Sequence, residues 1–351
     1  MVLATPIWIV SPRLFRFLGR QAKVAFTSTA AILHWLFMGN IEFVITGEPS
    51  FERQQIVFAN HQTLTDWWWL GLCAWHQGTP LISGIKIILM DYLKYVPFFG
   101  WLAYLIDFIF LKQKWALDEA TFTRSLTPLP NRPSEPLWLL IFPEGLLLHQ
   151  KNLNSAAAFI EKQKASLPPG SYTPRLPTNV ILPRSKGLYT CIKKLNNPEA
   201  IAPVTTLMDV TFAFSPSAQE QGLFPNQVLT PLAFFGKGTP DIVSRVHIDF
   251  RRMEGPVNGV DRLSQLSETE FTEWLNKRWE LKDDLLGYFR KNGQFEGFVG
   301  ARHDQSIQVG ARETSFKIVP KAMDFLRVFG AFFALWSIIA VFTLIGVFVR
   351  A

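Results

Sequence analysis

The residues best suited to chemistry lie in the segment Asn60-His61-Gln62-Thr63-Leu64-Thr65-Asp66, which follows a short apolar run at 56–59. Five residues of an ideal helix turn through about 500°, so His61 and Asp66 would not share a helix face. The two side chains can meet if His61 lies on a turn and Asp66 lies in the first turn of the following helix. Asp66 would then hold one imidazole nitrogen and raise the basicity of the other, which makes His61 a candidate general base.

The pair also has a plainer interpretation, in which Asp66 only caps a helix that begins near an unrelated histidine. If the pair is catalytic, the absence of a partner serine implies direct transfer, in which the base deprotonates a substrate hydroxyl. No Gly-x-Ser-x-Gly segment is present, which argues against a lipid hydrolase with a serine nucleophile.

A second candidate is Phe142-Pro143-Glu144-Gly145, which directly follows the apolar run at 137–142. Binding sites in α/β proteins form at the carboxyl ends of strands, so a carboxylate there could bind ligand hydroxyls or help to shape the site. The alternative is a Pro-Gly turn that carries a surface glutamate.

The elements that must position these residues alternate between strands and helices. Strands are predicted at 41–48, 56–59, 81–86, 108–111, 137–142, 179–182, 204–214 and 241–250, and helices at 66–76, 87–95, 115–126, 155–165 and 268–290. This alternation predicts an α/β domain over residues 41–290, with a mixed sheet flanked by helices.

Two further segments suggest a membrane. Residues 328–349 carry no formal charge over 22 positions, about 33 Å as a helix, and predict a transmembrane helix at 327–350. Residues 24–40 form a shorter uncharged segment, predicted to be a membrane-associated or transmembrane helix. The remaining parts are predicted as a basic N-terminal tail at 1–23 and a tether at 291–326.

The composition narrows the class of protein. Hydrophobic residues make up 48% and charged residues 18%, which excludes a disordered chain. The two cysteines, Cys73 and Cys191, are too few for a disulfide framework, and no histidine cluster completes a metal site. The formal net charge of +7 suits anionic ligands and anionic lipid surfaces.

The two candidate segments together resemble the glycerolipid acyltransferase family with the His-x4-Asp motif. NHQTLTD matches the first sequence block of that family and FPEG the third. DFIFLKQKWALDE is similar to the second block, NVILPRSKGL to the fourth, and EWLNKRWELKDDLL to a late helix of the branch with lysophosphatidate, lysophosphatidylinositol and lysocardiolipin acyltransferases. The resemblance covers roughly residues 40–290, and the order and spacing of the blocks are far more specific than either motif alone.

The resemblance implies transfer of a fatty acyl group from acyl-CoA to a lysophospholipid hydroxyl, without an acyl-enzyme. It places the general base on His61, its orienting partner on Asp66, and acceptor binding on Glu144 and Gly145. The candidate phosphate-binding cations are Lys86, Lys112, Lys114 and Arg184. The sequence departs from the family at Gln113, where arginine is common, and at Leu146, where threonine is common.

The best acceptor on these grounds is 1-acylglycerol 3-phosphate. Lysophosphatidylinositol and lysocardiolipin stay open as acceptors, as does a non-catalytic lipid-binding role on the same fold. We expect acyl-CoA as co-substrate, a lysophospholipid and the lipid bilayer as partners, and neither nucleic acid, nor a cofactor, nor a metal. The expected location is the endoplasmic reticulum membrane, with the active site facing the cytosol. Acyl-chain preference, regiochemistry and oligomeric state are left undetermined.

Overall fold

The computed structural model describes residues 11–50, 52–97, 99–168, 170–216, 222–230, 243–254, 258–295 and 313–330, together with Phe333 and Ser337. Its strands are β1 (Glu42–Gly47), β2 (Gln54–Ala59), β3 (Ile85–Met90), β4 (Ile109–Leu111), β5 (Leu137–Ile141), β6 (Thr206–Ser215), β7 (Arg245–Met253) and β8 (Thr314–Lys317). Its helices are α2 (Pro12–Met38), α3 (Asp66–Gln77), α4 (Thr79–Gly84), α5 (Phe99–Leu105), α6 (Trp115–Leu126), α7 (Gln150–Ser166), α8 (Ser185–Leu195), α9 (Pro225–Val228), α13 (Val260–Gln265) and α14 (Glu268–Asn292), with 3-10 turns η1 (Asp91–Tyr95) and η2 (Leu129–Asn131).

The strands form one mixed sheet in the order β4-β3-β5-β2-β6-β7-β1-β8. From β4 to β6 all neighbours are parallel, whereas β6 and β7 are antiparallel, and β8 runs antiparallel to β1. The predicted α/β class with a mixed sheet is therefore confirmed.

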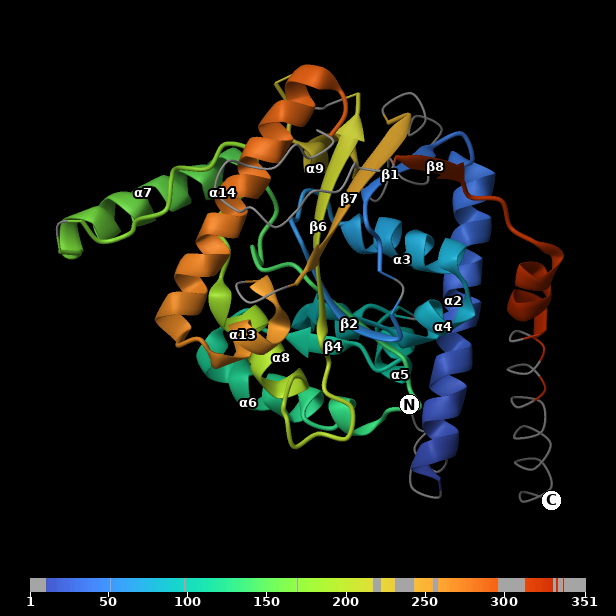
Figure 1. The fold of residues 1–351 in the computed structure, drawn as a ribbon. Helices are drawn as coiled ribbons and strands as arrows, with labels where there is room; N and C mark the ends of the chain where they lie inside the picture. The colour runs from blue at the N-terminus through green and yellow to red at the C-terminus, as the bar shows by residue number, and fades with distance from the viewer. Residues whose placement is uncertain are drawn as a thin grey trace.

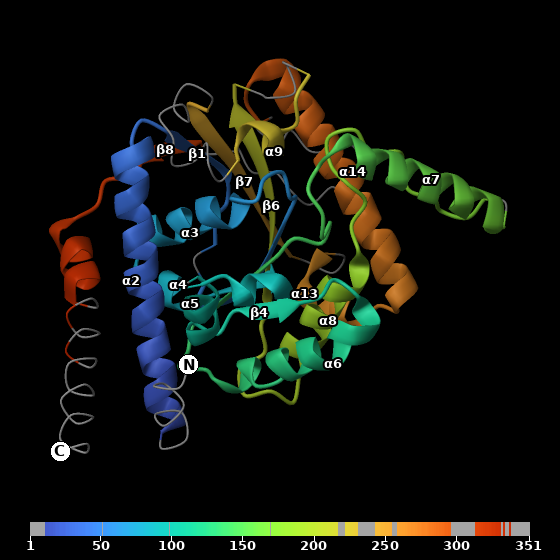
Figure 2. The ribbon, with the colours of Figure 1, turned by 180° about the vertical axis from the view of Figure 1, so that it is seen from behind.

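Helices cover both faces of the sheet (Figures 1 and 2). One face packs against α2, α3 and α4, and the other packs against α6, α8, α13 and α14. Alternate residues of β5 enter the two cores, with Trp138 and Leu140 on the first face and Leu137, Leu139 and Ile141 on the second. Burial on both faces explains why these strands read as continuous apolar runs. Helix α7 projects from the body of the domain (Figure 1).

Helix α14 is delimited by strong local signals. Ser267 accepts a hydrogen bond from the Glu270 amide at 3.3 Å, while the Glu270 carboxylate accepts one from the Ser267 amide at 2.9 Å. This reciprocal pair satisfies two amides that the helix itself cannot. Gly293 ends the helix in the left-handed conformation at φ +71°.

Helix α2 begins twelve residues before the predicted membrane segment at 24–40. Ser11 caps it by accepting a hydrogen bond from the Leu14 amide at 3.3 Å, and Pro12 occupies its first turn, so residues 12–23 of the predicted tail are helical. His34 is fully buried and meets Phe43 and Trp69 edge-on. Much of one face of α2 thus belongs to the core of the domain.

Most of the predicted transmembrane segment at 327–350 lies outside the described residues. In the part that is described, a helix runs from Ala322 to Gly330 and lies beside α2 (Figures 1 and 2). Asp324 of this helix accepts hydrogen bonds from Ser28 of α2 and Trp75 of α3. Over the residues described, no helix combines the length and apolar character that crossing a bilayer requires.

The region 79–95 differs from the prediction of a strand at 81–86 and a helix at 87–95. Residues 79–84 are helical and 85–90 form β3, because a six-residue run with Ile85, Ile87 and Leu89 on one side suits a pleated strand. The predicted strand at 179–182 is wrong, because residues 179 and 180 form a bend and residues 181 and 182 are irregular. Strand β8 lies within the stretch predicted as a tether.

Candidate active site

The candidate residues gather at one edge of the sheet. Strands β2, β5, β3 and β4 are parallel, so their carboxyl ends lie at the same edge. His61 follows β2 by two residues, Glu144 follows β5 by three, and Lys112 follows β4 directly. This edge is where α/β domains form their sites.

The structure brings His61 and Asp66 into contact. Nδ1 of His61 lies 2.9 Å from Oδ2 of Asp66, because His61 precedes α3 on a turn and Asp66 is the first residue of that helix. The Asp66 side chain is fully buried, whereas the His61 side chain keeps 18% of its surface exposed. The carboxylate is thus shielded from water and the imidazole is reachable by a ligand.

Asp66 also organises the turn that carries His61. Its Oδ2 accepts hydrogen bonds from the backbone amides of Gln62 at 2.6 Å and Thr63 at 3.0 Å, and its Oδ1 accepts one from the Thr63 hydroxyl at 2.6 Å. A carboxylate that receives two backbone N–H groups is an acceptor toward the imidazole as well, so Nδ1 of His61 carries the proton. The lone pair of Nε2 is left available as a base.

The turn at 142–145 wraps around His61. The Phe142 ring stacks on the imidazole with centroids 4.4 Å apart, and the Leu148 amide donates to the His61 carbonyl at 3.2 Å. Gly145 adopts φ +63°, a conformation that glycine reaches without strain. The first and third sequence blocks therefore form a single unit in the fold.

Glu144 lies beneath this turn with only 1% of its surface exposed, rather than at the surface as a headgroup ligand. Its Oε1 accepts a hydrogen bond from Nε1 of Trp279 at 3.1 Å. Burial raises the pKa of Glu144 to about 8, although the Trp279 indole, the His61 amide and the charge of Lys282 favour the ionised form. Contact with an acceptor headgroup would require Glu144 to leave this environment.

Three of the predicted cations surround the turn with exposed side chains. The Arg184 amide donates to the Pro143 carbonyl at 2.8 Å. The Arg184 side chain also lies close to Gly145, because a Cβ atom added to this glycine would be 3.7 Å from Cδ of Arg184. Lys112 and Lys114 flank Gln113, whose Nε2 donates to the Gly145 carbonyl at 2.9 Å. The second and fourth blocks thus both bind the third through its backbone.

Asp118 holds the lysine segment in place. Its two carboxylate oxygens accept hydrogen bonds from the Lys112 amide at 2.8 Å and the Lys114 amide at 2.9 Å. The backbone amides are thereby satisfied, and both lysine side chains remain exposed.

Lys86 has a different environment from these three cations. It is 4% exposed, and its Nζ donates to the carbonyl and the carboxylate of Asp107. Burial lowers the pKa of Lys86, while Asp107 opposes that shift. The structure therefore does not present Lys86 as a free cation at the surface of the site.

Helix α14 contributes buried residues that sequence reasoning did not single out. Trp279 reaches Glu144, and Lys282 donates to Asp209 of β6, which also receives Arg278 at 3.0 Å. Although burial opposes ionisation of Asp209, the two cations hold its pKa below the ordinary value. The sequence contained no signal for these contacts, because they join residues about 70 to 135 positions apart.

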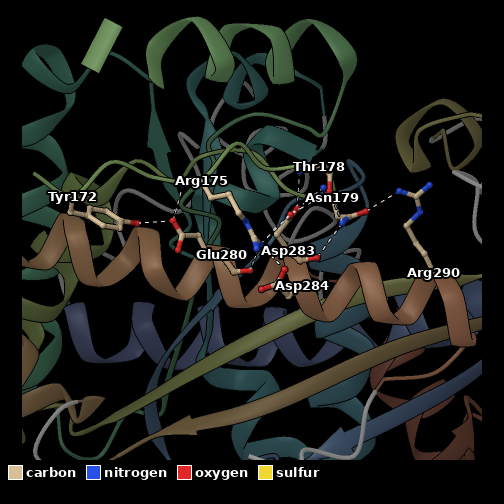
Figure 3. Close-up of polar contacts among 8 residues, drawn as sticks. All are labelled: Tyr172, Arg175, Thr178, Asn179, Glu280, Asp283, Asp284 and Arg290. Carbon is tan, nitrogen blue, oxygen red and sulfur yellow. Dashed lines mark hydrogen bonds and ion pairs between the residues drawn. The ribbon is translucent and has the colours of Figure 1, made fainter. Parts of the chain in front are cut away.

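A polar clamp fixes α14 against the segment that leads to Arg184 (Figure 3). Asp283 accepts hydrogen bonds from the amides of Thr178 and Asn179, and Glu280 accepts from the Arg175 amide at 2.8 Å. The remaining members, Tyr172, Asp284 and Arg290, add side-chain contacts around these. Helix α14 thus supports both the third and the fourth blocks.

Within the described ranges, no three histidine, cysteine or acidic side chains are grouped as a metal site would require.

Comparison with known proteins places this arrangement in a family. The chain matches the acyltransferase model over residues 40–206 and the acyltransferase C-terminus model over residues 244–321. An uncharacterized acyltransferase of Schizosaccharomyces pombe is 32% identical over 322 residues, which cover 84% of this chain and 81% of that protein.

Two relatives carry more specific names. A probable 1-acyl-sn-glycerol-3-phosphate acyltransferase of Arabidopsis thaliana is 28% identical, covering 81% of this chain and 67% of that protein. Lysocardiolipin acyltransferase 1 of Gallus gallus is 27% identical, covering 82% and 68% respectively. These matches, which extend beyond the four blocks into α14, show that the chain belongs to the glycerolipid acyltransferase family.

Proposed function

We propose that the chain transfers a fatty acyl group from acyl-CoA to the free hydroxyl of an anionic lysophospholipid, with 1-acylglycerol 3-phosphate as the preferred acceptor. The observation that carries this proposal is the His61–Asp66 pair, which leaves Nε2 of a partly exposed imidazole available as a base. Relatives named for lysophosphatidate and lysocardiolipin acylation support an acceptor of this class.

In the proposed reaction, Nε2 of His61 takes the proton of the acceptor hydroxyl as its oxygen attacks the thioester carbon. The Asp66 carboxylate stabilises the imidazolium that forms. The carbon–sulfur bond then breaks, and the CoA sulfur leaves with the proton held by His61. The products are the new ester and free CoA, and the base is regenerated without an acyl-enzyme.

The apolar part of the substrates has a candidate location on the side of the domain formed by α2 and α3. A small cavity of about 20 Å³ there is lined mainly by apolar residues of α2, α3 and β3, including Phe26, Trp67 and Trp68, and the two tryptophans directly follow Asp66. An acyl chain would enter only if these side chains moved apart. Lys23 also lines it, and burial lowers the pKa of that lysine to about 7, so its neutral form is populated there. We propose that this side of the domain receives the acyl chain.

We further propose that the domain works at a cytosol-facing endoplasmic reticulum membrane. Aromatic side chains of η1 and α5 are exposed, namely Tyr92, Tyr95, Trp101 and Tyr104. Aromatic rings that combine an apolar body with a polar tip favour the interfacial layer of a bilayer. Such a surface would bring the active site to its lipid substrates.

An acceptor panel tests the proposed function. The purified chain is assayed with one acyl-CoA against the lysophospholipids of phosphatidate, phosphatidylinositol and cardiolipin, and against uncharged monoacylglycerol. We expect 1-acylglycerol 3-phosphate to give the highest kcat/KM and monoacylglycerol to be the poorest acceptor. A higher value for lysophosphatidylinositol or lysocardiolipin would reassign the acceptor, and no turnover with any of them would favour a non-catalytic lipid-binding role.

The exposed cations give a second test. We expect Arg184→Gln, Lys112→Gln or Lys114→Gln to raise the KM for the anionic acceptor by about tenfold to a hundredfold, because a charge-assisted hydrogen bond to phosphate contributes about 1.5–3 kcal/mol. The matched control is Lys151→Gln, an exposed lysine on α7, which should leave both Michaelis constants unchanged. If none of the three variants changes the acceptor KM, the phosphate does not bind at this cluster.

A further inference from the structure

We infer that Trp279 is a positioning residue for His61, and that it acts through Glu144. This inference rests on the proposed function, since it concerns the same site. It goes beyond that function because Trp279 lies in the C-terminal part of the family match, residues 244–321, and would affect catalysis at His61 in the first block, residues 60–66.

The first step is the contact between Trp279 and Glu144. The indole is 2% exposed and donates its N–H to Oε1 of Glu144 at 3.1 Å. A carboxyl group this deeply buried is costly unless it is hydrogen-bonded, so this donor determines where Glu144 can reside. No other side chain of the described part of the structure donates a hydrogen bond to that carboxyl group within bonding distance.

The second step links Glu144 to the catalytic turn. The His61 backbone amide is one of the groups that favour the ionised form of the Glu144 carboxyl, and Glu144 lies in the turn that packs on His61. On either side of Glu144, Phe142 stacks on the His61 ring and the Leu148 amide binds the His61 carbonyl. A displacement of Glu144 would therefore disturb both of these contacts, which together set the position of the imidazole.

The third step is the rigidity of the helix that carries Trp279. The indole stacks on Phe58 of β2 with centroids 6.0 Å apart, and the Lys282 ammonium lies 5.3 Å from its ring centre. Lys282 is anchored on Asp209, and the clamp of Asp283 on residues 178 and 179 holds the next turn (Figure 3). Helix α14 is thus fixed to the sheet and to the fourth block, and it can transmit a defined position to Glu144.

The test removes only the indole N–H. In Trp279→Phe we expect kcat to fall by about tenfold to a hundredfold while the KM values for acyl-CoA and acceptor change by less than about twofold, since small misplacements of a catalytic group are costly in rate. Trp274→Phe is the matched control, because Trp274 lies on the same helix and donates its N–H to Asn258 at 3.0 Å instead. It should keep the wild-type kcat.

A second readout does not depend on turnover. The titration of the His61 ring, followed by NMR and assigned with His61→Gln, should shift in Trp279→Phe and stay unchanged in Trp274→Phe, because the Glu144 carboxyl beside the turn has moved. If the phenylalanine variant does not fold, 3-benzothienylalanine at position 279 replaces the N–H by sulfur and keeps the ring shape, with the same expectations.

The outcomes separate this inference from the proposed function. A fall in kcat together with an altered His61 titration supports the positioning role. An unchanged His61 titration overturns it whatever the kcat, and so does a rise in KM at constant kcat. If the wild-type chain acylates no acceptor, the proposed function fails, and the titration alone decides the coupling of Trp279 to His61.

Discussion

His61→Ala is expected to lower kcat by about 10²- to 10⁴-fold, the range typical for removal of a general base. The KM for the acceptor should change little, because Nε2 acts on a proton that moves only in the transition state. Steady-state kinetics with acyl-CoA and 1-acylglycerol 3-phosphate measures both constants. His149→Ala is the matched control, since His149 is exposed and caps α7, and its loss should leave kcat near the wild-type value.

Asp66 variants should be affected in two ways, because this carboxylate both orients His61 and binds two amides of the turn. Asp66→Asn replaces one acceptor oxygen by a donor, so we expect a loss of activity at least as large as for His61→Ala, accompanied by a lower melting temperature. Turnover like that of the wild type in His61→Ala would contradict direct base catalysis, as would the capture of an acyl group on a serine or cysteine.

The sequence predicted which residues gather at the carboxyl edge of the parallel strands, because the sequence signals for these residues are local. The apolar run at 56–59, the polar turn that follows it and the aspartate at the helix start lie within about ten residues of each other. The same holds for the strand at 137–141 and the turn after it. Parallel strands then bring these local units together without further information.

What the sequence did not predict depends on contacts between distant segments. Its neighbours in the sequence suggest that Glu144 binds a ligand, but its side chain is buried and accepts a hydrogen bond from Trp279, which lies 135 positions later. The sequence places Lys86 near the blocks as a candidate phosphate-binding cation, yet its side chain is buried and its ammonium donates a hydrogen bond to Asp107. The region 79–90 was assigned the wrong elements because a short apolar run suits a strand and a buried helix equally well.

The buried Glu144 should leave a signature in the pH dependence of stability. Burial raises the pKa of Glu144 from its ordinary value of about 4.5 to about 8 in the folded chain, so between these values the unfolded chain releases the proton while the folded chain keeps it. The free energy of unfolding should therefore fall as the pH rises from about 4.5 to about 8, and level off above that. A shift of this size corresponds to at most about 5 kcal/mol, at about 1.4 kcal/mol for each pKa unit.

Glu144→Gln removes this titration, so the difference in unfolding free energy between the wild type and this variant isolates it from every other group. We expect the wild type to lose about 3.5 kcal/mol relative to Glu144→Gln between pH 5 and pH 8, measured by urea denaturation in detergent. Glu119→Gln, which changes an exposed carboxylate on α6, should show no such trend. A difference that stays constant across this range would mean that Glu144 is ionised in the folded chain, and that the cations and amides around it outweigh its burial. A difference that falls as the pH rises would instead establish that the buried carboxyl of Glu144 is neutral in the folded chain below about pH 8, because its burial outweighs the Trp279 indole and the other groups that favour its ionised form.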